Sequence, residues 1–177
     1  FSWDAQRLYR RLVKVVNGAV TLLRQDAVPY VMGQSYQVEV VANGNTLEVR
    51  VDGVSLFGGP VVDSALSTGS VALYSWGNIG SVFDNVHVGP VDVPPTLTVD
   101  FNDGNFTGWQ VVNEGTWDAP SAWTVVGGVL QQTSNIYDGN TDGTVLPKKG
   151  TFAWYTNGLG WSNYKVAVQM RSTDDDA

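Results

Sequence analysis

The chain has 177 residues, of which 43% are hydrophobic and 15% are charged, and its formal net charge is −7 at pH 7. This acidic balance argues against nucleic acid and anionic membrane surfaces as partners, because both repel a negatively charged protein. The chain has no cysteine and a single histidine, His87, which excludes disulfides, thiolate catalysis, cysteine zinc sites and sites built from several histidines. No apolar run approaches the ~18 residues of a membrane-spanning helix, so we expect no membrane insertion.

Short strands joined by asparagine and glycine turns are predicted for the first half of the chain. Residues 1–25 contain two extended runs around Asn17-Gly18, a dipeptide that favours a two-residue hairpin turn. Residues 36–42 and 46–52 form a second predicted hairpin, and apolar and charged side chains alternate along 46–52 as in a strand with one buried face. A further strand is expected at 70–76. No segment of this half has a helical period.

The stretch from 81 to 109 joins two predicted halves. Residues 82–88 alternate like a strand that finishes a domain, and a new strand is expected after Pro95. Residues 91–96 are predicted to be a linker, because the surrounding sequence GPVDVPP is rich in proline, which removes a ladder donor. Later strands are predicted near 109–113, 122–126, 128–133, 151–156 and 163–172. About ten short strands predict an all-β fold, a two-sheet antiparallel sandwich.

Several segments resemble parts of concanavalin A-like jelly rolls, the group that includes laminin G-like modules and the carboxy-terminal domain of thrombospondins. In the second half, AWTVVGGVLQQTSN and GWSNYKVAVQMRSTDDDA are similar to the opening half of such domains, in which a Trp-x-Val…Gly…Gln strand pair precedes a strand that ends in an aspartate cluster. In the first half, RRLVKVVNG, LEVRVDG and GSVALYSWGNIGSVFDNVHV are similar to the closing half. The resemblance implies a jelly-roll sandwich.

The order of the halves is rotated relative to that family. In such domains the aspartate cluster is followed by an aromatic-rich strand that leads into a segment like FSWD, whereas here FSWD stands at 1–4 and one strand is missing between Ala177 and Phe1. The resemblance therefore implies one circularly permuted sandwich over residues 1–177, built from 1–90, the linker 91–96, and 97–177. We expect the end of one module of a tandem array, followed by the beginning of the next. The halves either close on each other or are completed by another copy.

Three acidic clusters are candidate calcium sites, because hard cations bind several carboxylate, amide and carbonyl oxygens. The first lies at the seam and contains Asp100, Asn102 and Asp103. The resemblance adds Asp84, which matches a last-strand aspartate that helps to hold a structural calcium in many jelly rolls. The alternative is that these residues cap turns without a metal.

The other two clusters lie later in the chain. Asp138, Asn140 and Asp142 match the D-x-[DN]-x-[DN]-G beginning of a calcium loop, but its twelfth position is Lys149 rather than glutamate, which rules out an EF-hand. A solvated turn is the alternative there. The third cluster is a run of three aspartates, Asp174, Asp175 and Asp176, and the resemblance places cations near it. Its alternative is a frayed, solvated terminus.

Aromatic side chains are candidate sugar-binding groups, because an exposed ring complements the apolar face of a pyranose. We expect this role for four residues, Tyr74, Trp76, Trp3 and Trp154, with Tyr155 and Trp161 as further candidates. Two of them, Tyr74 and Trp76, lie two apart on a predicted strand and are expected to share a face. Most aromatic residues of a sandwich belong to its core, where Trp109 and Trp123 are expected.

The combined prediction is a non-catalytic, calcium-stabilised module at the cell surface or outside the cell, acting in adhesion or in binding carbohydrate such as cell-surface glycans. The alternative is a structural subunit of a polymer, in which an open sheet edge is completed by strand exchange between copies. A hydrolase is the least expected class. Related glucanases carry Glu-x-Asp-x-Glu on one strand, and this spacing does not occur here.

Overall fold

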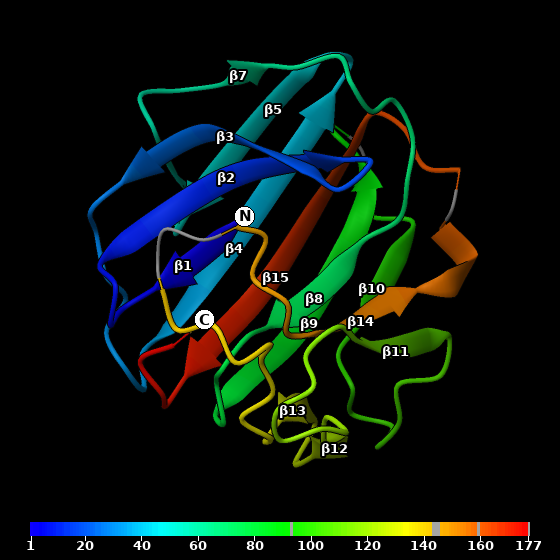
Figure 1. The fold of residues 1–177 in the computed structure, drawn as a ribbon. Coiled ribbons are helices and arrows are strands. Elements are labelled where there is room, and N and C mark those ends of the chain that lie inside the picture. Colours follow the sequence, from blue (N-terminus) through cyan, green and yellow to red (C-terminus); the bar gives the residue numbers. More distant parts are fainter. Residues whose placement is uncertain (93, 143–145, 159, 177) are drawn as a thin grey trace.

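The structure is a computed structural model that describes residues 1–92, 94–142, 146–158 and 160–176. It confirms the predicted fold class: the described chain is all-β and antiparallel, with one short 3₁₀ turn, η1 (Thr156–Gly158). Figure 1 shows two layers of strands that face each other as a β-sandwich. Among the described residues, no helix is long and apolar enough to cross a membrane.

The larger layer is a sheet with the strand order β12, β13, β9, β15, β4, β5 and β6, while β10 pairs with β9 and β7 pairs with β5. The strands of the first half are β4 (Ser35–Asn43), β5 (Thr46–Val51), β6 (Val54–Ser55), β7 (Val61–Val62) and β9 (Ser81–Pro90). Those of the second half are β10 (Leu97–Val99), β12 (Trp123–Val126), β13 (Val129–Gln132) and β15 (Tyr164–Ser172). Both halves of the chain therefore contribute to this sheet.

Strand β15 joins the two halves most closely. It lies between β4 and β9, and its residues pair with β4 from Tyr164 to Arg171 and with β9 from Tyr164 to Ser172. A bulge between Ala167 and Gln169 interrupts the pairing with β9. A strand from the second half thus separates two strands of the first half, and each of its edges is hydrogen-bonded to that half.

The front layer consists of two three-stranded sheets (Figure 1). One has the order β1 (Ser2–Asp4), β2 (Tyr9–Val16) and β3 (Ala19–Asp26). The other has the order β11 (Trp109–Asn113), β14 (Thr151–Tyr155) and β8 (Ala72–Ser75). The second sheet also combines the two halves, because β8 pairs with β14.

The predicted turns have the backbone geometry that their residues favour. Asn17 and Gly18 have φ angles of 50° and 79°, as a two-residue hairpin between β2 and β3 requires. Asp52 and Gly53, at 49° and 80°, form the same kind of turn between β5 and β6. Turn residues with positive φ therefore set the strand boundaries that the sequence predicts.

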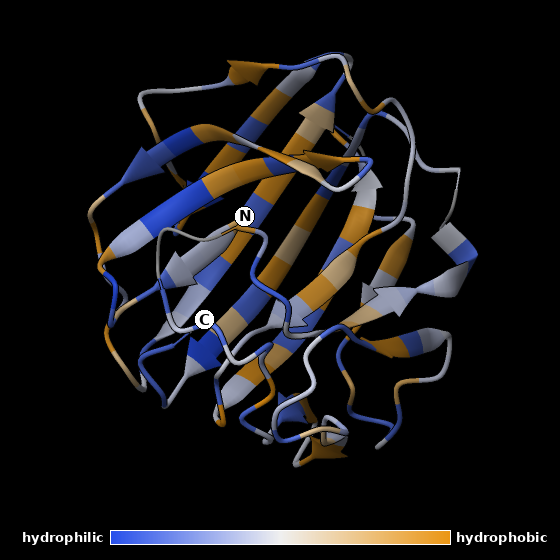
Figure 2. Cartoon of the chain, in the orientation of Figure 1, coloured by the Kyte–Doolittle hydropathy of each residue, from blue (hydrophilic) through white to orange (hydrophobic). Residues whose placement is uncertain are grey.

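The core lies between the layers and follows the alternation of apolar side chains. Figure 2 shows hydrophobic and hydrophilic residues alternating along the strands of the large sheet. Buried residues of that sheet include Val49, Val86 and Leu130, and they face Leu73 and Ala153 of the front layer within one hydrophobic cluster. Trp109 and Trp123 are also buried, as predicted. Burial of alternate apolar residues removes their side chains from water and stabilises the two-layer arrangement.

The seam between the halves is a hairpin. Strand β10 folds back on β9 so that Leu97 lies opposite Val88, and the Thr96 amide donates to the Val88 carbonyl over 2.7 Å. At Gly89 the returning chain comes so close that a Cβ would lie 2.5 Å from Pro95 Cα. Only glycine allows this approach without a backbone shift.

Candidate functional site

The candidate site lies where the two chain ends meet, which Figure 1 shows beside β1. After β15, residues 173–176 turn over the segment that follows β1. The Ala5 and Gln6 amides both donate to the Asp175 carbonyl over 2.9 Å. The Tyr30 hydroxyl donates to the Asp174 carbonyl over 2.6 Å. These bonds hold the third predicted acidic cluster against the amino-terminal segment.

The three aspartates of this cluster are close together. One carboxylate oxygen from each of Asp174, Asp175 and Asp176 lies within 4.8 Å of the others, and all three residues are half-buried. Within the described parts of the chain, this is the one group of three or more acidic, histidine or cysteine side chains that meets this distance. The Ile79 amide donates to Asp174 Oδ2 over 3.0 Å and fixes the first carboxylate, so the cluster is ordered by its surroundings.

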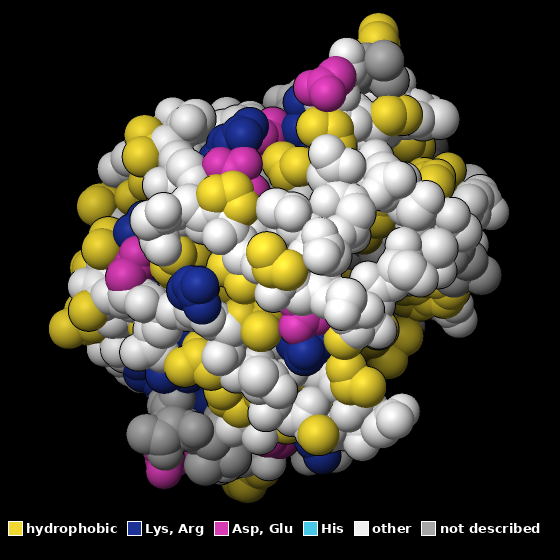
Figure 3. Space-filling model, turned by 90° about the horizontal axis from the view of Figure 1, so that it is seen from above, with side chains coloured by type: hydrophobic (Ala, Val, Ile, Leu, Met, Phe, Trp, Pro, Cys, Tyr) yellow, Lys and Arg dark blue, Asp and Glu magenta, His cyan; other side chains and the backbone are white. Residues whose placement is uncertain are grey.

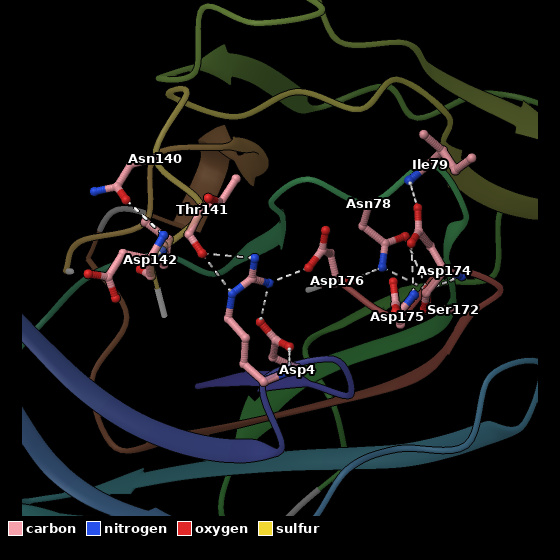
Figure 4. A network of polar contacts seen from close by, with 12 residues as sticks. Asp4, Asn78, Ile79, Asn140, Thr141, Asp142, Ser172, Asp174, Asp175 and Asp176 are labelled. Atoms are coloured by element: carbon pink, nitrogen blue, oxygen red, sulfur yellow. Dashed lines mark hydrogen bonds and ion pairs between the residues drawn. The ribbon is translucent and has the colours of Figure 1, made fainter. Parts of the chain in front are cut away.

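Arg7 connects this cluster to two other segments (Figure 4). Its Nη1 donates to Asp4 Oδ2 over 3.1 Å and also to Asp176, while Nε and Nη2 donate to the Thr141 carbonyl over 3.2 and 3.1 Å. Asp4 is fully buried, and sequence reasoning missed it as a site residue. Two carboxylates, those of Asp4 and Asp176, thus bond to a single guanidinium group.

The charges of this network alter its titration. Burial, and to a lesser extent the charges of Asp4 and Asp174, raise the pKa of the Asp176 carboxyl, although its bond to Arg7 opposes this effect. For Arg7, burial on its own lowers the pKa, but the bonds to Asp176 and Asp4 outweigh it and raise the pKa. Burial thus favours the neutral form of Asp176 more than the bond to Arg7 favours its charged form.

The loop at 138–142 lies on the other side of Arg7. The Asn140 amide donates to Asp138 Oδ1 over 3.1 Å, and the Asp142 amide donates to Asn140 Oδ1 over 2.9 Å. These bonds give Asp138 and Asn140 the turn-capping role that the sequence left as an alternative. Lys148 donates to the Asp142 carbonyl, and Gly143 of the motif lies outside the described residues. Calcium binding by this loop stays a prediction.

The seam residues also cap turns. Asp100 Oδ1 accepts from the Asn102 amide and Asp103 Oδ1 accepts from the Asn105 amide, both over 3.1 Å. The bond from the Asn102 amide lowers the pKa of the Asp100 carboxyl. Asp84 accepts from the Asn85 amide over 2.7 Å and from its side chain over 3.0 Å. The described carboxylates of the seam are not gathered as closely as those at 174–176.

Two of the predicted sugar-binding rings are buried, which corrects that part of the prediction. Trp3 is 4% exposed, donates through Nε1 to the Val28 carbonyl over 2.7 Å and packs against Tyr30 and Tyr36. Trp76 is 1% exposed. Because β8 ends at Ser75, strand alternation does not extend to Trp76, and this ring turns inward rather than sharing a face with Tyr74.

The other two predicted rings lie on the outward face of the front layer. Tyr74 alternates with the buried Leu73, and Trp154 alternates with the buried Ala153, so both half-buried rings point away from the core. The Tyr74 hydroxyl donates to the Lys148 carbonyl over 2.9 Å. Burial raises the pKa of Tyr74 well above its ordinary value. The further candidates Tyr155 and Trp161 stack on each other, with ring centroids 5.7 Å apart.

One exposed ring beside this network was not predicted. Trp117 stacks on Tyr137, with ring centroids 6.1 Å apart and an interplanar angle of 27°, and Tyr137 contacts Trp76 edge-on at 6.0 Å. Arg7 and Lys148 lie over the Trp76 ring at 4.6 and 4.5 Å from its centroid. The sequence signal for this ring was its position between Gly115 and Pro120, outside any predicted strand. An aromatic side chain in such a segment is not assigned to the core by strand alternation.

Comparison with models of known protein families gives no match. A search among curated proteins finds no similar sequence either.

A groove separates the two sheets of the front layer. It has a volume of about 360 Å³ and is lined from one side by Val13 and Val15 of β2, and from the other by Ala72 and Tyr74 of β8. The segment 146–148 also lines it. Strand β1 pairs with β2 only at Tyr9–Arg11. In the described chain, β8 pairs with β14 on one edge and with no strand on the other. Two incompletely paired strand edges therefore border this groove.

Proposed function

We propose that this chain is a non-catalytic, calcium-stabilised module of concanavalin A-like jelly-roll type, which acts in adhesion or carbohydrate binding outside the cell or at its surface. The observation that carries the proposal is the gathering of Asp174, Asp175 and Asp176 within 4.8 Å, next to the buried Asp4. Arg7 is the cation that bonds to this group.

The donors fit a calcium ion. Calcium prefers oxygen ligands and accepts flexible geometry, and the cluster offers carboxylate oxygens from three residues. The Asp175 carboxylate makes no hydrogen bond or ion pair with the described part of the chain, whereas Asp174 is fixed by Ile79 and Asp176 by Arg7. A half-buried site with few ligands binds weakly. Weak sites suit extracellular modules, for which calcium constants are about 10⁻⁴–10⁻³ M.

A bound ion at this place would stabilise the fold because it would hold in shape a segment that contacts distant parts of the chain. The cluster contacts the turn after β1 through the Asp175 carbonyl and the 77–79 segment through Asp174. Relief of repulsion between three adjacent carboxylates would add to the effect. At a calcium concentration 100 times the dissociation constant, the expected gain is about 2.7 kcal/mol.

Thermal unfolding with calcium and with chelator tests this proposal. For a chain of this size, we expect calcium to raise the melting temperature by roughly 5–10 °C. Asp175→Asn removes one ligand charge without touching the bonds of Arg7, and we expect it to abolish most of the calcium effect. Asp92→Asn, an equivalent change at an exposed position of the linker, should keep it. Equal melting curves with calcium and chelator in the unmodified protein would contradict the proposal.

The groove between β2 and β8 supports a second candidate, a polymer subunit that accepts a strand from another copy. Val16 and Ala19 are the hydrogen-bonded pair that closes the two-residue turn. Because hydrogen-bonded pairs alternate along an antiparallel ladder, the main-chain groups of Lys14 also point to β3. Those of Val13 and Val15 consequently point into the groove. On the other side of the groove, the Val71 carbonyl accepts from the Tyr155 amide, so the main-chain groups of Val71 point to β14. By the same alternation, the main-chain groups of Ala72 and Tyr74 point away from β14 and into the groove.

Val15→Pro distinguishes this candidate. It removes an amide that points into the groove and leaves the β2–β3 ladder intact, which an edge position tolerates. If copies exchange strands there, the unmodified protein should form concentration-dependent oligomers in light scattering, and Val15→Pro should reduce them while Val15→Ala does not. Monomers of all three proteins at high concentration would exclude strand exchange at this groove.

A further inference from the structure

Trp117 is unusually exposed for its residue type. It is 61% exposed, and it is the only aromatic residue among the exposed large hydrophobic residues of the described chain. An exposed indole offers a large, flat apolar face that a ligand can cover.

The ring is held in place rather than left loose. The Trp117 amide donates to the Tyr137 carbonyl over 2.9 Å, and the Tyr137 amide donates back to the Trp117 carbonyl over 3.3 Å. The indole stacks on Tyr137 and lies so close to Gly139 that a Cβ there would sit 2.6 Å from Trp117 Nε1. Tyr137 in turn contacts the buried Trp76. One face of the indole is therefore anchored through Tyr137 to the interior.

Polar residues flank this ring and its support, Tyr137, in the sequence. Asp118, next in the chain, accepts from the Asn135 amide over 2.7 Å through Oδ2. Asp138 and Asn140 follow Tyr137 in a loop that side-chain hydrogen bonds hold in shape. Carboxylate and amide oxygens beside an aromatic face can accept hydrogen bonds from hydroxyl groups of a ligand. Because two of these residues are aspartates, an anionic ligand would be repelled.

We propose that Trp117 is the stacking platform of a binding site for neutral pyranose sugars. The axial C–H bonds of a gluco-configured ring would lie on the exposed indole face, and its hydroxyl groups would reach the neighbouring Asp and Asn oxygens. The rigid mounting lowers the entropy cost of binding. This inference rests on the carbohydrate-binding part of the proposed function and assigns it to a residue outside the rings that the sequence suggested.

Titration of the intact chain with cellohexaose, a neutral β-glucan, tests the platform by calorimetry and by the NMR signal of the Trp117 indole N–H. We expect Trp117→Ala to weaken binding about tenfold or more, a loss typical of removing a stacking contact. Trp117→Phe should retain part of the affinity. Leu66→Ala, an exposed apolar truncation elsewhere, should retain all of it. An oligogalacturonide of equal length, which is anionic, should not bind.

The possible failures differ in meaning. Glycan binding that Trp117→Ala leaves unchanged would overturn the platform and leave the proposed function standing. Preference for the anionic oligomer would overturn the assigned ligand class. If a glycan array and the cellohexaose titration both show no binding while calcium still stabilises the fold, the platform and the carbohydrate-binding part of the proposed function are both wrong. Equal melting temperatures of the Trp117 variants and the unmodified protein show that any loss is not caused by unfolding.

Discussion

At the residue scale, Arg7 has the most partners in the network at the chain ends. It bonds to Asp4 and Asp176 and to the Thr141 carbonyl, and its side chain is 13% exposed. Asp4 is fully buried, so removal of Arg7 would leave its carboxylate without this ion-pair partner. An uncompensated buried charge is among the most destabilising features that a single substitution can create.

We therefore expect Arg7→Ala to lower the free energy of unfolding by about 3–5 kcal/mol in the presence of chelator. Arg7→Lys keeps the charge but cannot reproduce the planar set of bonds, so its loss should be smaller. Chemical denaturation measures both. Arg50→Ala, which breaks ion pairs with Glu39 and Glu48 on a more exposed surface, is the control and should cost about 1 kcal/mol or less.

Calcium should reduce the difference in stability between Arg7→Ala and the unmodified protein. Because Arg7 competes with a bound ion for Asp176, its removal frees one ligand, and calcium should stabilise Arg7→Ala more than the unmodified protein. A smaller calcium effect in the variant would mean that the ion does not share Asp176 with Arg7.

Several surface charges elsewhere are arranged in pairs. On the face seen in Figure 3, basic side chains lie beside acidic ones instead of forming a continuous basic patch. Among the ion pairs of the chain, Arg50 forms bonds of 2.8 and 2.7 Å to Glu39 and Glu48. The bond to Arg50 lowers the pKa of the Glu48 carboxyl. On this face, the surface lacks the positive footprint of nucleic-acid-binding proteins.

At the element scale, the hairpin of β9 and β10 depends on close contact between Gly89 and Pro95. We expect Gly89→Ala to destabilise the fold by about 1–3 kcal/mol, because the added Cβ meets backbone atoms that cannot move aside easily. Gly69→Ala, where a Cβ would meet nothing within 4 Å, should be nearly neutral. Denaturant midpoints of the two variants give the comparison. Equal midpoints would mean that the linker moves away at little cost.

Strands and turns were predictable because they are encoded locally. The alternation along 46–52 and the Asn17-Gly18 turn each involve neighbours in the sequence, and β5 and the β2–β3 hairpin lie where they were expected. The candidate site was only partly predictable. The acidic cluster at 174–176 was visible as a run of like residues, but its link to Arg7 joins positions 169 residues apart and has no local signature.

The aromatic residues show a second limit of sequence reasoning. Tyr74 and Trp76 differ by two positions, which predicts one shared face only while the strand continues, and β8 stops between them. Trp117 lies in an irregular segment with no periodic pattern, so its exposure depends on the distant loop of Tyr137. Side-chain burial in loops is set by tertiary packing, and the alternation of apolar and polar residues along a strand does not predict it.

At the scale of the whole molecule, the pairing of β15 with β4 and β9 couples residues 1–90 to residues 97–176. We expect cleavage at a protease site introduced at the exposed residues 94–96 to leave the two fragments associated, because neither can complete the large sheet alone. Size-exclusion chromatography after cleavage, with and without urea, measures this association. Either fragment, expressed alone, should lack the cooperative unfolding of the intact chain. Two fragments that separate in buffer and remain folded would show independent domains.

The central position of β15 also constrains the route by which the protein folds during synthesis. Strands β4 and β9 leave the ribosome well before β15, so at ~5–20 residues per second they wait for several seconds with apolar faces and backbone edges unprotected. In that interval β4 and β9 can pair directly, and such a ladder must open again before β15 can enter. We expect long-range strand insertion of this kind to slow folding and to expose the nascent chain to aggregation.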